Sequence, residues 1–181
     1  MVQSAKAYID LINYYTGEHF TVSQLTQYDT TKILPKQYEK LANDLWDWPI
    51  LYKYAQPLTD SQQYIKRLCD NKNIEVYIVT VSHPNVMKSK SDFIQREYPF
   101  VSQDNIIFTH NKQLLNIDCL VDDNPDNLKG GGYKKLLFNY YWNKQFKAKE
   151  NGMIRVYDWD DVYNKIIEAL KIYKINEEEL K

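Results

Sequence analysis

The chain has 181 residues, enough for one domain with a sizeable core and a small added subdomain. Its 23 basic and 24 acidic residues nearly cancel, so the charge offers no footprint for polymeric nucleic acid or a membrane surface. No apolar run reaches the roughly 18 residues of a membrane helix, and no signal-peptide segment opens the chain. Cys69 and Cys119 lie in apolar surroundings typical of reduced, buried thiols. We therefore expect a cytoplasmic protein without a membrane partner.

The first 56 residues carry helical patterns rich in aromatic side chains, and they contain no predicted strand. We expect helices over residues 5–15, 20–28 and 35–48. Thr21 or Ser23 can cap the second helix, and Pro49 ends the third. This region would form a helical cap over the rest of the domain.

From residue 57 onward, helix-like and strand-like segments alternate. Helices are predicted over 57–71 and 85–97, strands over 74–81, 105–108, 117–122, 135–141 and 153–157, and a last helix to about residue 173, capped by Asp160 or Asp161. Such alternation predicts an α/β domain with a Rossmann-like parallel sheet and right-handed crossovers over residues 57–175. Residues 176–181 would form a disordered tail.

An apolar run over residues 117–121 ends abruptly in two adjacent carboxylates, Asp122 and Asp123. Apolar residues in a run favour a strand covered on both faces, and Pro125 turns the chain out of that strand. The carboxylates then lie at a strand's carboxyl end, where open α/β sheets bind ligands. Adjacent carboxylates repel each other unless a cation or proton lies between them, and hard oxygen ligands favour Mg²⁺ over Zn²⁺. The alternative is a solvated acidic turn.

Polar residues follow two other predicted strands. Thr80 and Ser82 lie at the end of the 74–81 segment, and Lys112 follows the 105–108 segment. A hydroxyl, an ammonium group and a carboxylate–Mg²⁺ unit suit a phosphoryl group, because the first two hold its oxygens and the metal neutralises charge. Each residue alone has an ordinary structural explanation, and their shared position at strand exits favours the phosphate hypothesis.

These motifs resemble those of the haloacid dehalogenase-like phosphatases, and more closely the 5′(3′)-deoxyribonucleotidase branch, including its cytosolic pyrimidine type. The similarity lies in Val79-Thr80, in Lys112 upstream of a strand ending Asp122-Asp123-Asn124-Pro125, in the cap-like segment 14–29 and in the last strand 155–159.

The resemblance implies Mg²⁺-dependent dephosphorylation of (deoxy)ribonucleoside 5′-monophosphates or another small phosphate ester. Carried over to this chain, the roles are phosphate binding by Thr80 and Ser82, charge neutralisation by Lys112, a less defined role for Lys90, Mg²⁺ binding by Asp122 and Asp123, and nucleobase stacking by Trp46, Trp48 and Tyr52. Packing within the core or cap is the alternative for these three aromatic residues.

One expected motif is not in its place. The family's reaction needs an aspartate nucleophile on an Asp-x-Asp motif at the exit of a first, central strand. That strand would precede the helix at 5–15, where this sequence has only Met1-Val2-Gln3-Ser4. Asp158-Trp159-Asp160 ends a later apolar strand and would suit a circular permutation, although helix capping is the simpler interpretation. Asp29 has no strand before it.

Three interpretations stay open: Met1 is internal to a longer enzyme, the protein is an inactive truncation that keeps nucleotide or partner binding, or another chain supplies the strand. A non-catalytic binding module of phage or mobile-element type is the competing class, and a homodimer is left open. Without the first strand, the strands bearing Thr80 and Asp122 either close up or leave a gap. Each buried group left unpaired costs roughly 1–3 kcal/mol.

Overall fold

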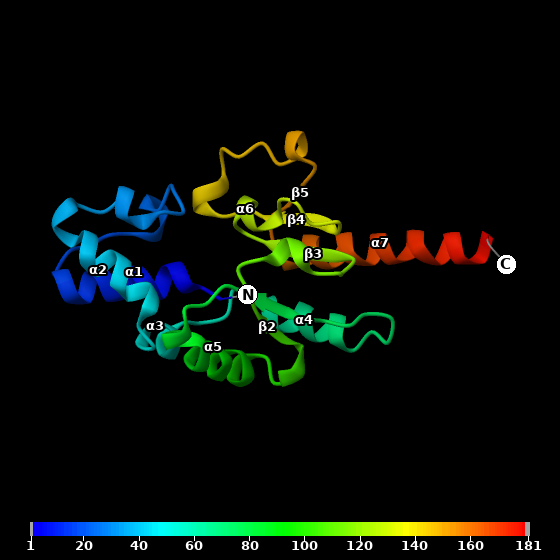
Figure 1. Cartoon of the computed structure of the whole chain (residues 1–181), viewed down its shortest axis with the longest axis horizontal. Coiled ribbons are helices and arrows are strands. Elements are labelled where there is room, and N and C mark those ends of the chain that lie inside the picture. Colours follow the sequence, from blue (N-terminus) through cyan, green and yellow to red (C-terminus); the bar gives the residue numbers. More distant parts are fainter. Residues whose placement is uncertain (1, 180–181) are drawn as a thin grey trace.

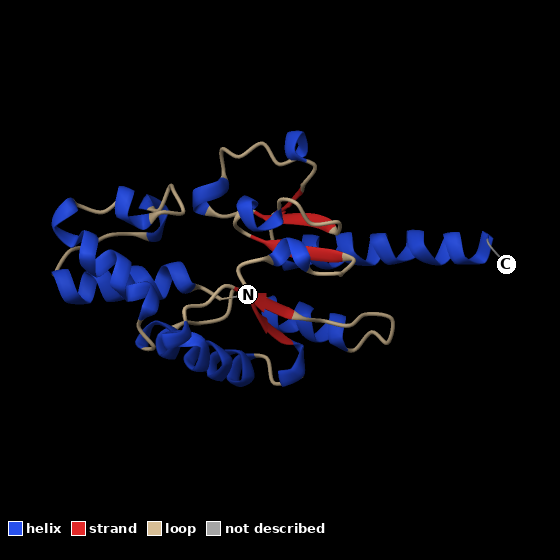
Figure 2. Cartoon of the chain, viewed as in Figure 1, coloured by secondary structure: helices blue, strands red, loops and turns tan. Residues whose placement is uncertain are grey.

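The structure is a computed structural model that describes residues 2–179, with side chains described as far as residue 170. It divides into a helical region, residues 4–54, and an α/β region that contains all the strands described (Figures 1 and 2). The helical region lies on the left of Figure 1, and the long C-terminal helix extends to the right. The cap touches elements that follow the strands' carboxyl ends: α3 (Ile50–Tyr54) contacts α5 (Pro84–Glu97), and η1 (Val22–Gln24) contacts η7 (Tyr141–Asn143).

The first predicted helix is confirmed as α1 (Ser4–Thr16), which ends at Gly17 in the left-handed conformation, φ 74°. The second predicted helix is wrong, because residues 20–28 form only the 3₁₀ turn η1. There the Thr21 N–H donates to Gln24 Oε1 at 2.6 Å, as expected of a capping residue. This segment buries only Leu25 fully, too little apolar surface to stabilise a longer helix.

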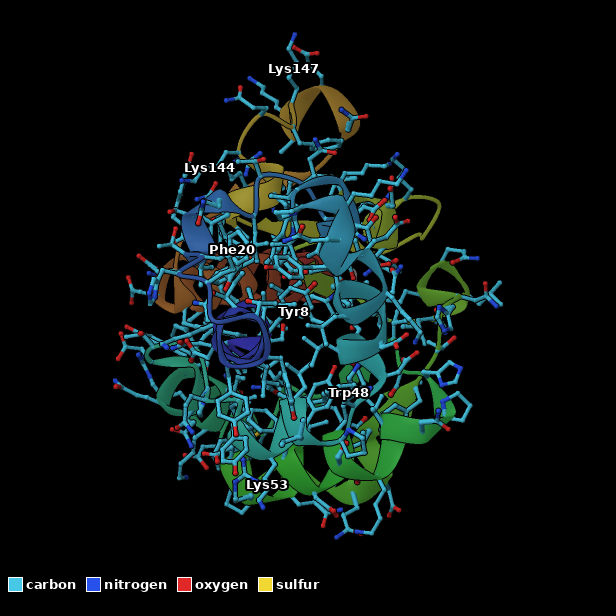
Figure 3. The ribbon with its side chains drawn as sticks, turned by 90° about the vertical axis from the view of Figure 1, so that its left-hand side faces the viewer. Tyr8, Phe20, Trp48, Lys53, Lys144 and Lys147 are labelled. Atoms are coloured by element: carbon cyan, nitrogen blue, oxygen red, sulfur yellow. The ribbon has the colours of Figure 1, made fainter. Side chains whose placement is uncertain are left out.

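The third predicted helix is present in three consecutive pieces. These are η3 (Lys36–Tyr38), α2 (Glu39–Asp44) and η4 (Leu45–Asp47), followed by α3 and preceded by η2 (Thr30–Lys32). Pro49 ends this run and also begins α3 as its N-cap residue. Tyr8 holds the region together, since its hydroxyl bonds with Thr30 Oγ1 and Ala42 O, both at 3.0 Å. In Figure 3, which views the cap side, Tyr8 lies near the middle and Lys53 and Lys147 lie near opposite rims.

The α/β region alternates helices and short strands, as the sequence predicts. Its elements are α4 (Ser61–Cys69), β1 (Ile78–Thr80), α5, η5 (Gln103–Asn105), β2 (Ile106–Phe108), η6 (Lys112–Leu114), β3 (Cys119–Asp122), α6 (Pro125–Leu128), β4 (Lys134–Phe138), η7, η8 (Lys149–Asn151), β5 (Ile154–Val156) and α7 (Trp159–Glu179). The 74–81 segment contributes only three residues to β1, because its ladder with β2 covers just those three. The α4 helix begins later than predicted, after Asp60 at φ 60°.

The predicted parallel sheet is confirmed, but it is divided in two. One sheet has the order β1–β2 and the other β3–β4–β5, and the strand pairs within these two sheets are parallel. Figure 2 shows the two groups of strands as separate red ribbons. Within residues 2–179, β1 and β3 do not pair, so these strands have not closed up into one sheet. The main apolar core still includes side chains from both sheets and from the cap.

The last helix differs from its prediction at both ends. Its N-terminus is capped by Asp158, not by Asp160 or Asp161: Asp158 Oδ1 accepts from the Asp161 N–H at 2.8 Å, and Asp161 Oδ2 accepts from the Tyr157 N–H at 3.1 Å. The helix runs past the predicted end near residue 173 to Glu179, so it includes part of the predicted tail, whose last two residues lie outside the described part of the chain. No helix within residues 2–179, α7 included, combines the length and apolarity needed to cross a membrane.

Candidate functional site

A buried ion pair joins the two sheets. Lys112 in η6 and Asp122 at the end of β3 are 6% and 8% exposed, and Lys112 Nζ donates to Asp122 Oδ2 at 2.6 Å. The same ammonium group donates to the carbonyl oxygen of Val79 in β1 at 3.3 Å. The Lys112 side chain therefore contacts both sheets. Its partner in β1, Val79, is the residue before Thr80. The structure thus brings together residues of the three strand exits that the sequence singled out.

The acidic turn after β3 saturates the Asp122 carboxylate. Besides Lys112, it accepts from the Asn124 N–H at 2.8 Å and from Asn127 Nδ2 at 3.1 and 3.2 Å. Asn124 in turn accepts from the Asp126 N–H at 3.0 Å and so caps α6, whose first residue is Pro125. The turn is ordered by its own side chains, with Asp122 buried and Asp126 exposed to solvent.

Unlike Asp122, the next residue, Asp123, makes no hydrogen bond from its carboxyl group to any other side chain that the structure describes. Burial and, second, the negative charge of Asp122 raise the pKa of Asp123 from 3.8 to about 7. Its backbone carbonyl is held by Trp142 Nε1 at 3.2 Å and by Asn143 Nδ2 at 2.7 Å.

Lysine side chains cover the free edge of β1. The carbonyl of Thr80 accepts from the Thr109 N–H, after β2. Since successive carbonyls in a strand point to opposite sides, those of Val79 and Val81 face away from β2. Lys112 donates to the first and Lys90 to the second. Two backbone acceptors that would need a neighbouring strand are therefore satisfied by ammonium groups.

Lys90 lies in α5, partly buried, with its ammonium group 5.0 Å from the ring centre of Tyr52. Burial and, second, the positive charge of Lys112 lower the pKa of Lys90 to about 8. Two ammonium groups are thus close enough to influence each other, and an anion would relieve that repulsion.

The two predicted hydroxyl residues lie beside these lysines along the chain. Thr80 ends β1, and its Oγ1 donates to the carbonyl of Val81 at 3.2 Å. Ser82 is buried, and its Oγ donates to the carbonyl of His83 at 3.2 Å. Among the described residues, both hydroxyls bond only to the next residue's carbonyl, so a bond rotation frees them for another acceptor.

The three predicted stacking residues lie in different surroundings. Trp46 is stacked on Tyr8, with ring centres 4.4 Å apart, and its Nε1 donates to Thr30 Oγ1, so one face of its ring packs within the cap. Tyr52 is 5% exposed and faces Lys90. Trp48 is partly exposed and makes an edge contact with Tyr15 at 5.4 Å. Trp46 and Trp48 are both partly exposed, whereas Tyr52 is buried, and nucleobase stacking by these residues stays a prediction.

Sequence reasoning missed several residues of this region. The negative charge of Asp47 in the cap helps to raise the pKa of Tyr52 and partly opposes the lowering of the pKa of Lys90. Burial of its hydroxyl group and the charges of Asp123 and Asp122 raise the pKa of Tyr28 to about 12, and its ring meets Trp142 edge-on at 5.7 Å. Asn143 and Asn127 were missed as well. A signal existed only for Asn127, one turn beyond Asp123 on a helix begun by Pro125.

The two aspartates are hard oxygen donors of the kind a divalent cation prefers. Mg²⁺ usually keeps several waters and takes one or two carboxylates together with substrate phosphates. Asp123 fits this role because its carboxyl group is held by no other described side chain, whereas Asp122 is already fully hydrogen-bonded. Among the side chains that the structure describes, as far as residue 170, no group of three His, Cys, Asp or Glu residues could hold a metal ion.

A helical cap above a parallel α/β region, with lysines and paired aspartates at the strand exits, defines a haloacid dehalogenase-like domain. The family model described as 5′ nucleotidase, deoxy (pyrimidine), cytosolic type C protein matches residues 2–172. The chain therefore belongs to this family, the 5′(3′)-deoxyribonucleotidase branch that the sequence resembles.

Individual relatives agree with this assignment. A 5′(3′)-deoxyribonucleotidase of Clostridium acetobutylicum is 41% identical over 96 residues, 53% of this chain and 51% of the relative. A 5′(3′)-deoxyribonucleotidase of Bacillus subtilis is 30% identical over 119 residues, 65% of this chain and 66% of the relative. A nucleotidase of C. acetobutylicum is 33% identical over 175 residues, 90% of this chain and 86% of the relative. The chain thus spans about half the length of the first relative and about two thirds of the second.

Proposed function

We propose that this chain forms the phosphate-binding part of a nucleotidase site for (deoxy)ribonucleoside 5′-monophosphates, used with Mg²⁺. The observation that carries the proposal is the cluster of Lys90, Lys112, Asp122 and Asp123 between the two sheets. The names of the relatives support a deoxyribonucleotide as the substrate class. Cys69 and Cys119 are both free, which favours a reducing compartment such as the cytoplasm.

Each residue of the cluster has a role that follows from its contacts. Lys90 and Lys112 would exchange their backbone carbonyl partners for phosphate oxygens, a stronger charge-assisted bond. The hydroxyls of Thr80 and Ser82 would add neutral donors. Asp123, with Asp122, would hold Mg²⁺, which when bound neutralises negative charge on the phosphate. Lys112 keeps contact with Asp122 in the structure and so couples the phosphate position to the acidic turn.

The covalent step needs a carboxylate nucleophile beside this cluster. The aspartates at the exit of β5 are engaged elsewhere: Asp158 caps α7, and Asp160 accepts from Tyr64 and Asn164. Asp29 is bonded to Thr31 and paired with Lys32. We therefore propose that the 181-residue chain binds the nucleotide but does not turn it over through an aspartyl-phosphate.

The test incubates the 181-residue chain with dUMP, dTMP and an aryl phosphate in the presence of Mg²⁺ and measures released phosphate, while calorimetry measures dUMP binding. We expect binding without release. Lys90→Met should weaken dUMP binding at least tenfold, whereas Lys53→Met should not, because Lys53 lies over the ring of Tyr54 on the exposed side of α3. Release abolished by Asp158→Asn would show a permuted enzyme, and release insensitive to that change would reveal another nucleophile.

A second candidate is a non-catalytic module that binds a protein partner. It is favoured by the closed Lys112–Asp122 pair, which satisfies both charges without any ligand. Absence of dUMP and inorganic phosphate binding by the folded chain would favour this module over the nucleotidase site. A homodimer stays a prediction that sedimentation can test.

A further inference from the structure

Asn143, a residue outside the cluster, is almost completely buried, at 2% exposed, and its amide group makes four hydrogen bonds. Its Nδ2 donates to the carbonyls of Asp123 at 2.7 Å and Phe138 at 2.8 Å. Its Oδ1 accepts from the Tyr140 N–H at 3.1 Å and from Arg155 Nη1 at 2.8 Å. An amide has two donor hydrogens and two acceptor positions, so all of its hydrogen-bonding capacity is used.

Arg155 in β5 fixes which way this amide points. Its Nη1 also donates to Asn139 Oδ1 at 2.9 Å, and its Nη2 donates to the carbonyls of Asn143 at 3.0 Å and Phe146 at 2.6 Å. A guanidinium group only donates, so the side facing it must be the amide oxygen. The amide nitrogen then faces the Asp123 and Phe138 carbonyls. The network joins the residue after β3, the last residue of β4 and the middle residue of β5.

The Asp123 carbonyl lies just beyond the β3–β4 ladder, whose last pair is Asp122 with Leu137. The carbonyl belongs to the peptide whose N–H, on Asn124, donates to Asp122 Oδ1 at 2.8 Å. Fixing this peptide fixes the direction of the Asp123 side chain on one side and the bond to Asp122 on the other. Asn143 thus acts on both carboxylates without touching either.

We propose that Asn143, oriented by Arg155, is a positioning residue for the two carboxylates of the acidic turn. The role of those carboxylates rests on the proposed function. The competing explanation is that the network only strengthens the β3–β4–β5 sheet. The two explanations predict different effects of removing the Asn143 donors. A positioning role predicts faster amide exchange in the acidic turn alone, whereas a purely structural role predicts faster exchange throughout the sheet.

The test compares Asn143→Asp with the matched control Asn139→Asp. Each substitution keeps an oxygen for Arg155, but only the first removes the two donors to the Asp123 and Phe138 carbonyls. Amide hydrogen exchange measured by NMR on the free chain should show the Asn124 amide exchanging at least tenfold faster in Asn143→Asp, with the β4 amides changed less than twofold. Asn139→Asp should leave both unchanged.

An unchanged Asn124 amide, or equal acceleration of the β4 amides, would overturn the positioning role. If Asn143→Asp does not fold, Arg155→Lys tests the same idea, since it loosens the amide without removing its donors; a few-fold acceleration confined to Asn124 is then expected, and none would refute the role. A parallel dUMP titration should show at least tenfold weaker binding for Asn143→Asp. If the wild-type chain binds no dUMP, the proposed function fails while the exchange test still decides the positioning role.

Discussion

The β1–β2 and β3–β4–β5 sheets are held at their carboxyl ends in different ways. In the three-stranded sheet, Asn143 hydrogen-bonds to Asp123 after β3 and to Phe138 at the end of β4, and Arg155 of β5 holds Asn143 in place. In the two-stranded sheet, the ammonium groups of Lys90 and Lys112 cover the free carbonyls of β1. Lysine side chains have several rotatable bonds and prefer an anion to a neutral carbonyl. The three-stranded sheet is thus held by planar groups, and the free edge of β1 by flexible side chains.

The largest effect is expected where the two sheets meet. Lys112→Met leaves the buried Asp122 carboxylate without its cation and should lower the free energy of unfolding by about 3–5 kcal/mol. Lys129→Met, which breaks the exposed pair with Asp126, should change it by less than about 0.5 kcal/mol. Urea denaturation measures both.

Adding Asp122→Asn to Lys112→Met should recover part of that loss, because it removes the unpaired buried charge. Equal effects of Lys112→Met and Lys129→Met would show that the pair does not join the sheets.

In the three-stranded sheet, we expect the stability of the fold to depend on pH through Asp123. The pKa of Asp123 is about 7 in the folded chain and 3.8 ordinarily, so the folded state holds a proton that the unfolded state releases between about pH 4 and 7. Its contribution to stability is therefore present below pH 4 and is lost as the pH rises through 7. Asp123→Asn, which mimics the protonated group, should raise the melting temperature above wild type at pH 8 and match it at pH 4.

Mg²⁺ at pH 8 should narrow that difference, because a cation stabilises the ionised carboxylate of the wild type alone. A constant offset between the two proteins from pH 4 to 8 would show that Asp123 does not titrate in this range.

The smallest effect on stability is expected in the two-stranded sheet, at Lys90. Lys90→Met removes one hydrogen bond and a contact with Tyr52, but it also removes a partly buried charge that Lys112 repels. We expect a change of less than about 1 kcal/mol in the free energy of unfolding at pH 7. A loss as large as that of Lys112→Met would mean that Lys90, like Lys112, is needed to hold the fold, and would contradict a role of Lys90 in binding alone.

Patterns along the chain were enough to predict α1, the run from 36 to 47, α5 and the parallel arrangement, because each rests on local periodicity. The helix predicted over residues 20–28 was wrong because its sequence pattern does not show how little apolar surface the segment buries. Asp158 was passed over as a helix cap because Asp160 and Asp161 are equally suitable by type. Trp46 was grouped with Trp48 since only packing against Tyr8 separates them.

The sequence by itself determined the family, the α/β class and the order of Thr80, Lys112 and Asp122 at successive strand exits, because apolar runs and the residues that follow them are local features. Only the tertiary structure decided that the sheet is divided, that Lys112 joins its parts, and that Asn143 and Arg155 hold the acidic turn. These are contacts between residues 10 to 33 positions apart, and which partners meet depends on how the strands are placed in space.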